Sequence, residues 1–168
     1  VNFDHILIHT NQNFDKNLKH VFFKDLGIKK PKYDLNIKSN NAIETISKIF
    51  IKINDILDKE KPDAFFVLGD TNSSLSAIVA KKKKIPIFHY EAGNRCFDQR
   101  VPEEINRKLV DHIADINLTY SNFARENLLR EGFAPDRVFN IGSPLGEVIQ
   151  RNIKRINKSN ILKRINLN

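Results

Sequence analysis

Three short segments of the sequence place carboxylates beside hydroxyl, amide or basic side chains. In the first segment, Asp70, Thr71 and Asn72 follow an apolar run that ends at Gly69. If a helix begins there, its amino terminus would attract an anion such as a pyrophosphate, and Thr71 would contact that substrate. The alternative is that Asp70 and Thr71 only cap the helix.

The second segment places His89, Glu91, Gly93 and Arg95 after another apolar run. Burying Glu91 without a partner would be costly, so we expect Arg95 to pair with it. Gly93 allows a backbone conformation open to few other residues and would bring the loop close to a substrate. Alternatively, Glu91 and Arg95 form a purely structural ion pair, and His89 is a hydrogen-bonded core residue. The neighbouring Cys96 is expected to be a bystander.

The third segment starts a predicted helix with Pro102, followed by Glu103 and, four residues later, Arg107. Proline suits a first helical turn, and acidic residues there interact favourably with the helix dipole. Residues four apart share a helix face, so Glu103 and Arg107 can also form a surface pair. Capping and surface pairing alone would account for this segment.

Apolar periodicity and turn residues predict alternating strands and helices along the whole chain. The all-apolar run 64–69 is typical of a strand that is buried on both faces of a parallel sheet. We expect strands at 3–9, 64–69, 85–90, 116–120 and 137–142, and helices at 15–25, 42–58, 72–83, 102–114, 121–131 and from Ser143-Pro144 onward. Ser121 is expected to cap its helix and Gly132 to end it. This order predicts a doubly wound, Rossmann-like α/β domain with a parallel sheet.

In such folds the sites lie at the carboxyl ends of the strands, so the three segments should meet at one edge. Asp70, Glu91 and Glu103 would then share a cleft with arginines. Carboxylates held together in this way can have their pKa values pushed apart for acid and base work. The combination predicts proton abstraction and leaving-group chemistry on a polar, anionic substrate.

Length and composition agree with a globular domain of ordinary size. The chain has 168 residues, of which 40% are apolar and 29% are charged. No apolar run approaches the length of a membrane span, and the first residues do not resemble a signal peptide. The single cysteine cannot form an internal disulfide, which favours the cytoplasm. The chain contains no methionine and opens directly on a strand-like run, so we expect it to be part of a longer reading frame.

The net charge of +8 is concentrated in one place. Residues 151–168 contain six lysines and arginines and no acid, and the run Lys81–Lys84 adds to the excess. A basic tail can bind RNA or acidic lipid, but it can equally be a solvated helix. The interleaved aromatic and basic residues of a single-strand binding platform are missing, so we expect no nucleic-acid partner and no membrane insertion.

The string GDTNSSLSAIVAKKKKIPIFHYEAGNRCFDQRVPEEINRK closely resembles the central block of bacterial non-hydrolysing UDP-N-acetylglucosamine 2-epimerases. Its Gly-Asp-Thr, His-x-Glu-Ala-Gly-x-Arg and Pro-Glu-Glu-x-Asn-Arg motifs are specific in combination. The loop NRCFDQRVPEE looks most like the branch that forms UDP-N-acetyl-L-fucosamine for capsule or O-antigen synthesis. The resemblance covers about residues 3–150.

This resemblance implies one half of a GT-B-type enzyme with two Rossmann-like domains and the active site between them. It implies elimination of UDP to a 2-acetamidoglycal and re-addition with inversion at C2, without metal or nicotinamide. Asp70, Glu91 and Glu103 match the family's catalytic carboxylates. Arg107 matches a supporting arginine, and Arg95 and His89 are expected to support the site too. A homodimer is expected for the full-length protein.

The chain also departs from the family pattern. The family opens with a strand and a Gly-Thr-Arg-Pro-Glu turn that this sequence lacks, and its second domain supplies a catalytic histidine and most UDP contacts. Residues 12–15 replace a Gln-His-x-Gln segment of an allosteric site, so that regulation is not expected. We expect residues 1–150 to form the amino-terminal domain without its first strand. Residues 151–168 would form a basic helical tail or the start of the interdomain connection.

Three other functions remain open from the sequence alone. A GT-B glycosyltransferase or a hydrolysing epimerase would share the fold, and a non-catalytic binding module would use the basic tail. Dense carboxylates near the strand ends argue against the binding module, because they repel phosphate backbones. The chain is expected to be inactive alone, because half of its cleft would lie in the second domain.

Overall fold

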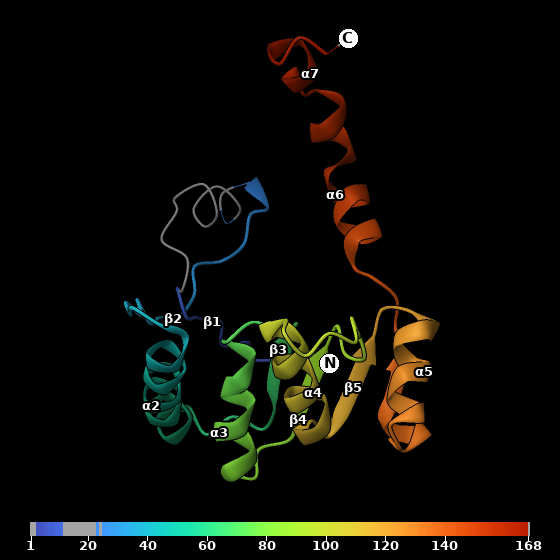
Figure 1. Cartoon of the computed structure of the whole chain (residues 1–168). Coiled ribbons are helices and arrows are strands. Elements are labelled where there is room, and N and C mark those ends of the chain that lie inside the picture. The colour runs from blue at the N-terminus through green and yellow to red at the C-terminus, as the bar shows by residue number, and fades with distance from the viewer. Residues whose placement is uncertain (1–2, 12–22, 24, 168) are drawn as a thin grey trace.

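The computed structural model describes residues 3–11, 23 and 25–167, and all the strands in this part of the chain are parallel (Figure 1). One sheet pairs β1 (Ile8–His9) with β2 (Tyr33–Asp34). The other has the order β3 (Phe65–Leu68), β4 (Ile87–Tyr90), β5 (Ile116–Thr119) and β6 (Val138–Asn140). The helices are α2 (Ala42–Glu60), α3 (Ala77–Lys82), α4 (Pro102–Ile113), α5 (Asn122–Arg130), α6 (Leu145–Asn157) and α7 (Ile161–Arg164), with 3-10 turns at Ser74–Ser76 and Pro135–Arg137.

The alternation of parallel strands and helices confirms the predicted Rossmann-like α/β fold. Figure 1 shows α2, α3, α4 and α5 arranged as a layer along the sheet. The strand register aligns Val67, His89, Asn117 and Val138 across the four strands, and all four side chains are buried. These four side chains lie on the buried face of the sheet, which the helices cover.

Helix α2 illustrates how local sequence sets an element. Asn41 accepts a hydrogen bond from the backbone N–H of Glu44 at 2.9 Å and so caps the amino terminus. Lys61 adopts the left-handed conformation at the other end. The isoleucines recur at helical spacing, and Ile49 and Ile53 are almost fully buried. The helix predicted over 42–58 is therefore confirmed.

Two sequence predictions about strands need correction. The run 64–69 is not buried on both faces, because the side chains of Phe66 and Leu68 are more than half exposed while Val67 is buried. Helices of the described chain pack on the Val67 face, so only alternate residues of β3 are covered. Strand β2 was not predicted, although Tyr33, Leu35 and Ile37 alternate as strand residues do. The helix predicted at 15–25 and the segment 12–15 lie outside the described residues, apart from Phe23 and Asp25.

The carboxyl-terminal helices α6 and α7 extend away from the sheet (Figure 1). Neither contains a buried residue, which agrees with a helix that lacks a packing partner. Arg155 of α6 contacts Asp25 through an ion pair of 3.5 Å and a hydrogen bond to the backbone carbonyl. Helix α6 runs through residue 151, so the expected division at 150/151 falls inside a helix and remains a prediction.

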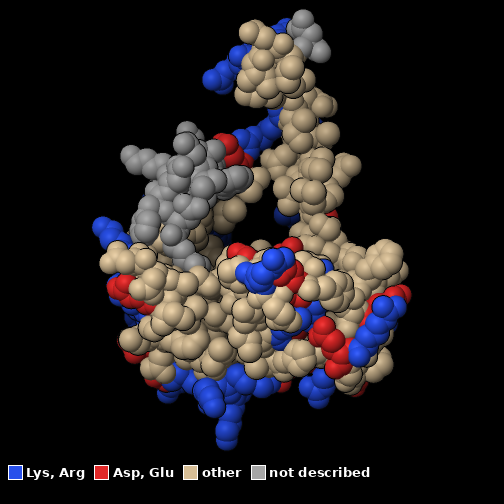
Figure 2. All heavy atoms as spheres, in the orientation of Figure 1, with Lys and Arg blue, Asp and Glu red and all other residues tan. Residues whose placement is uncertain are grey.

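Basic side chains gather at the lower end of the body in Figure 2, where α3 ends. Two members of the lysine run there are paired with acids: Lys81 lies 2.7 Å from Asp115, and Lys83 contacts Asp58. No helix in the part of the chain that the structure describes is both long and apolar enough to cross a membrane.

Gly93 brings the loop after β4 into close contact with α5. Its φ of +80° lies in the left-handed region, and a Cβ there would come within 2.2 Å of the backbone oxygen of Ala124. Ser121 caps α5 as predicted by accepting from the N–H of Ala124 at 3.1 Å, which fixes that first turn. The helix backbone cannot yield to a side chain at position 93.

We therefore expect Gly93→Ala to lower the free energy of unfolding by roughly 2–5 kcal/mol, from left-handed strain plus overpacking. The matched control is Gly132→Ala, since Gly132 has φ of +91° with nothing within 4 Å of an added Cβ. Its expected cost is about 1–2 kcal/mol, from strain alone. Urea denaturation measures both, and equal losses would contradict the close packing at Gly93.

Candidate functional site

Asp70 follows β3 at the carboxyl edge of the sheet and is held by α4. Arg107 donates to its Oδ2 from Nε at 2.8 Å and from Nη2 at 2.6 Å. The side-chain amide of Asn106 donates to the Asp70 backbone carbonyl at 2.9 Å. Two consecutive α4 residues therefore fix both the side chain and the backbone of Asp70.

The alternative that Asp70 and Thr71 cap the next helix is wrong. The 3-10 turn begins at Ser74, and no side chain caps it. Thr71 contributes only its backbone carbonyl, which accepts from the N–H of Ser74 at 2.9 Å. Its side chain is exposed at the rim of the edge, so its contact with a substrate remains a prediction.

Glu91 follows β4 at the same edge and adopts an unusual backbone conformation. Its φ is +71°, a region that costs a residue with a Cβ about 1–3 kcal/mol. Its Oε2 lies 3.2 Å from the point where a Cβ on Gly69 would stand, so the glycine leaves room for the carboxylate. Burial, and then the negative charge of Asp70, raise the pKa of Glu91 above its usual value, against the opposing charges of His89 and Arg107.

Arg95 is not the partner of Glu91, and that prediction is wrong. Its buried guanidinium donates to Asp111 at 2.7 Å and forms two hydrogen bonds to Glu131, of 2.7 and 2.6 Å. Burial lowers the pKa of Arg95, but the hydrogen bond to Glu131 and the charge and hydrogen bond of Asp111 outweigh it and raise the pKa. Arg95 therefore points toward α4, which carries Asp111, and toward the carboxyl end of α5, where Glu131 lies.

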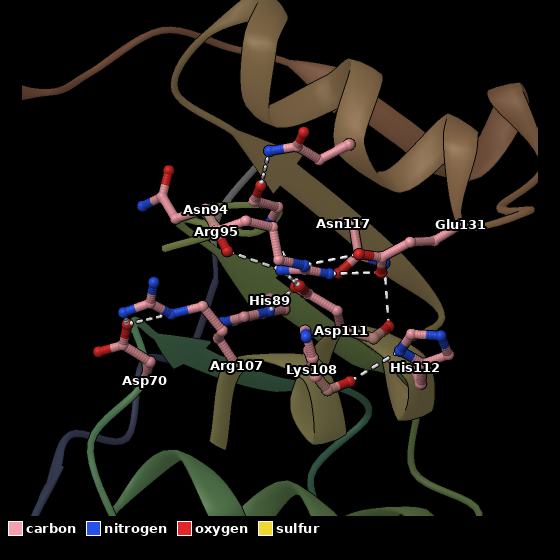
Figure 3. A network of polar contacts seen from close by, with 12 residues as sticks. Asp70, His89, Asn94, Arg95, Arg107, Lys108, Asp111, His112, Asn117 and Glu131 are labelled. Atoms are coloured by element: carbon pink, nitrogen blue, oxygen red, sulfur yellow. Dashed lines mark hydrogen bonds and ion pairs between the residues drawn. The ribbon is translucent and has the colours of Figure 1, made fainter. Parts of the chain in front are cut away.

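His89 is a fully buried core histidine, as one of the two alternatives held. Its Nδ1 lies 2.7 Å from Asp111 Oδ1, and its Nε2 lies 3.0 Å from the carbonyl of Gly69. Figure 3 shows Asp111 between His89 and Arg95, with the pair of Asp70 and Arg107 alongside.

The two neighbouring glutamates of α4 have different surroundings. Glu103 is exposed, and it makes no hydrogen bond or ion pair to the residues that the structure describes. The predicted surface pair with Arg107 does not form, because Arg107 turns to Asp70 and, at 3.3 Å, to Glu104. The structure thus brings Asp70, Glu91 and Arg107 together and leaves Glu103 at the rim.

Glu104 is fully buried and organises the loop before α4. It accepts from the backbone N–H groups of Cys96 at 3.1 Å and Phe97 at 3.3 Å. Lys108 Nζ lies 3.3 Å from Oε1 of Glu104. Burial raises the pKa of Glu104, but the hydrogen bonds from Cys96 and the contact with Lys108 outweigh it, so the pKa is lowered.

The sequence reasoning missed three anchoring residues of α4, namely Glu104, Asn106 and Asp111. All three are buried polar side chains. Glu104 and Asp111 are seven residues apart, so they share a helix face, and the apolar Val110 lies beside Asp111. Polar residues on the face of a helix that its apolar residues turn inward could have indicated buried anchoring side chains.

An aromatic pair lies beside Glu91. The ring centroids of Tyr90 and Tyr120 are 5.0 Å apart in an edge-to-face arrangement. Burial, and then the charge of Glu91, raise the pKa of Tyr120 to about 12. In the part of the chain that the structure describes, no three His, Cys, Asp or Glu side chains are grouped to hold a metal ion. The expected absence of a cofactor remains a prediction.

The family model described as UDP-N-acetylglucosamine 2-epimerase matches residues 1–168. The chain belongs to this family. The UDP-N-acetylglucosamine 2-epimerase from Rickettsia bellii, whose structure has been solved, is 52% identical with a TM-score of 0.90, and the match covers 98% of this chain and 44% of that one. The Methanocaldococcus jannaschii UDP-GlcNAc 2-epimerase in complex with UDP-GlcNAc and UDP is 42% identical with a TM-score of 0.92, over 98% of this chain and 46% of that one.

A further epimerase relative differs in substrate. The UDP-2,3-diacetamido-2,3-dideoxy-D-glucuronate 2-epimerase of Pseudomonas aeruginosa is 43% identical over 82% of this chain and 40% of its own length. The chain thus spans less than half the length of these epimerases. Family membership and one Rossmann-like half of their fold are shown by these matches.

The raised pKa of Glu91 makes the stability of the chain depend on pH. The folded state keeps the Glu91 proton to higher pH than the unfolded state, so stability falls as pH rises from below 4.5 through the folded-state pKa. Glu91→Gln removes the ionisable group, so the variant should not lose this stability as pH rises. We expect the melting temperature of the variant to exceed that of the parent increasingly as pH rises through this window.

Glu44→Gln is the control of opposite sign, because the hydrogen bonds from Lys48 and the Asn40 backbone lower the pKa of Glu44. Here the parent should be the more stable protein above the ordinary pKa, and its advantage should shrink as pH falls. A pH-independent difference for Glu91→Gln, measured by thermal denaturation, would contradict the described surroundings of Glu91.

Proposed function

We propose that the chain is the amino-terminal, acid/base half of a nucleotide-sugar C2 epimerase that acts on a UDP-N-acetylhexosamine. The observation that carries the proposal is the meeting of Asp70 and Glu91 at the ends of adjacent parallel strands, with Arg107 bound to Asp70. Membership in the epimerase family supports it, as does the M. jannaschii relative whose structure holds UDP-GlcNAc and UDP.

The reaction would proceed by elimination and re-addition. A carboxylate removes the C2 proton, the C1–O bond to UDP breaks, and its electrons leave with UDP as the C1–C2 double bond of a 2-acetamidoglycal forms. UDP then attacks C1 while a proton reaches the opposite face of C2. Inversion therefore requires proton carriers on both faces, and Asp70, Glu91 and Glu103 are proposed for these roles.

The surroundings of the three carboxylates suit different tasks. Glu91 keeps its proton to higher pH than an ordinary carboxyl, because its pKa is raised, and is therefore suited to giving and taking a proton. Asp70 is held by Arg107, whereas Glu103 stands exposed where a substrate or a second domain would meet it. Thr71 is exposed at the same edge and is a proposed substrate contact. Gly93 is buried, with its N–H on Asp111 and its carbonyl on Asn127, so its proposed role is to shape the loop that meets the substrate.

Several finer features belong to the same proposal. The loop NRCFDQRVPEE supports a substrate of the UDP-N-acetyl-L-fucosamine-forming branch, with a role in capsule or O-antigen synthesis. We also propose a cytoplasmic homodimer for the full-length protein. Because the chain spans less than half of its relatives, the remaining UDP contacts would come from a second domain, and residues 1–168 alone would be inactive.

A chimera tests the function directly. Residues 1–168 would replace the matching segment of the R. bellii protein, whose 52% identity and TM-score of 0.90 favour correct assembly. The chimera, incubated with UDP-N-acetylhexosamines in D₂O, should form the C2 epimer with deuterium at C2, and residues 1–168 alone should not. Release of free sugar would indicate a hydrolysing enzyme, sugar transfer to an acceptor a glycosyltransferase, and no turnover would contradict the proposal.

The same chimera tests the roles of the carboxylates. Asp70→Asn, Glu91→Gln and Glu103→Gln should each lower kcat by roughly 10²–10⁴-fold, the range typical for a proton-transfer group. Asp58→Asn is the control, because this exposed carboxylate lies near the carboxyl end of α2 and, among the residues that the structure describes, forms its hydrogen bond and ion pair with Asn54 and Lys83. A near-normal kcat for any of the three variants would refute the role of that carboxylate.

A further inference from the structure

The carboxylate of Asp111 lies fully buried beneath the two loops that carry Asp70 and Glu91. Its Oδ1 is 2.7 Å from His89 Nδ1, its Oδ2 accepts from Arg95 Nη1 at 2.7 Å, and the N–H of Gly93 lies 3.3 Å from both oxygens. A buried carboxylate is costly unless it is fully paired, and here it has a partner on every side (Figure 3).

The partners of His89 determine how its ring is protonated. The carbonyl of Gly69 can only accept, so Nε2 must donate to it at 3.0 Å. His89 Nδ1 and Asp111 Oδ1 are 2.7 Å apart, so one of them donates a proton to the other, and the permanent charge of Arg95 on Asp111 Oδ2 favours Nδ1 as the donor. His89 then bridges Asp111 and the backbone of Gly69 as a doubly protonated, positively charged ring.

These contacts end within two residues of Asp70 and of Glu91. Gly69 precedes Asp70, and the fully buried His89 lies two residues before Glu91 in the chain. Gly93 and Arg95 follow Glu91, so the turn around its left-handed backbone is fixed on both sides. Such a conformation persists only where the surroundings hold it in place.

The network continues from α4 to α5. Arg95 binds Glu131 through two hydrogen bonds, and the side-chain amide of Asn127 donates to the Gly93 carbonyl at 3.0 Å. Charges alternate along the path from the buried side chains of His89, Asp111 and Arg95 to the exposed Glu131. Each charge is therefore balanced by its neighbour, and the loop is tied to two helices.

We propose that Asp111 is a positioning residue for the epimerase reaction, which sets the separation of Asp70 and Glu91 by linking His89, Gly93 and Arg95 to α4. This inference rests on the proposed function for its kinetic consequence. Its structural part, the doubly protonated His89 bridge, stands on the contacts alone.

The kinetic test uses the chimera with the R. bellii protein. Asp111→Asn keeps the shape of the side chain but removes its charge. We expect kcat to fall about 100-fold, as small misplacements of reacting groups do, with KM for the UDP-sugar changed less than about twofold. A kcat within about threefold of the parent, or a change confined to KM, would overturn the proposal.

Asp115→Asn is the matched control, because Asp115 lies just after α4 and binds β4. Asp111 accepts from a backbone N–H just after β4, whereas Asp115 accepts from that of Ile87, the first residue of β4, at 2.9 Å. Asp115 also pairs with Lys81, at the end of β4 away from the site. It should lose stability without loss of kcat. An equal fall in kcat for both variants would assign the effect of Asp111→Asn to general destabilisation and overturn its positioning role.

His89→Gln tests the link from its other end, and it stands alone as the test if Asp111→Asn does not fold. It removes the bridge to Gly69 and should also lower kcat. If Asp111→Asn folds, the double variant should lose no more than the larger single loss. An unchanged kcat for His89→Gln, or fully additive losses, would contradict a single connected network.

An NMR measurement on residues 1–168 keeps this proposal separate from the proposed function. With ¹⁵N-labelled histidine, both ring nitrogens of His89 should carry protons in the parent, and Asp111→Asn should remove the proton from Nδ1. A parent ring with one unprotonated nitrogen would overturn the bridge, even if the chimera is an active epimerase. An inactive chimera with a doubly protonated His89 would refute the function but not the bridge.

Discussion

The arrangement of the site depends on one buried anion, the carboxylate of Asp111. It is surrounded by His89, Arg95 and the N–H of Gly93, each within 3.3 Å, and has no water-exposed surface. Removing the charged Arg95 would leave this buried carboxylate less well compensated, and breaking a buried ion pair in this way is strongly destabilising. The loops at the ends of β3 and β4 therefore have little freedom to move independently of α4.

Other polar side chains along α4 also hold the loops at the ends of the strands. Glu104 holds the backbone of the loop at Cys96, Asn106 and Arg107 hold Asp70, and Asp111 holds the loop around Glu91. One helix thus positions the segments that follow two strands, β3 and β4, through polar side chains that are mostly buried. The exposed Glu103 lies on the same helix, so a carboxylate at the rim is carried by the element that fixes the two inside.

The fold and the location of the site could be predicted from the sequence because they follow from local rules. Alternating apolar periods predict parallel strands and helices, and parallel strands bring their carboxyl ends to one edge. The partners of charged residues could not be predicted in the same way. Arg95 is near Glu91 in sequence but binds Asp111 and Glu131, because contacts between elements are set by packing across 16 and 36 residues. The exposure of Phe66 and Leu68 likewise depends on which face the helices cover.

Asp70 and Glu91 act on each other across adjacent strand ends. A ¹³C NMR titration of the Glu91 side-chain carboxyl, in the parent chain and in Asp70→Asn, measures this interaction. Burial and the charge of Asp70 both raise the pKa of Glu91, so the titration should lie above the usual value of 4.5 in the parent and move down in Asp70→Asn. A carboxyl that titrates at its usual value, or that does not respond to Asp70→Asn, would contradict the account.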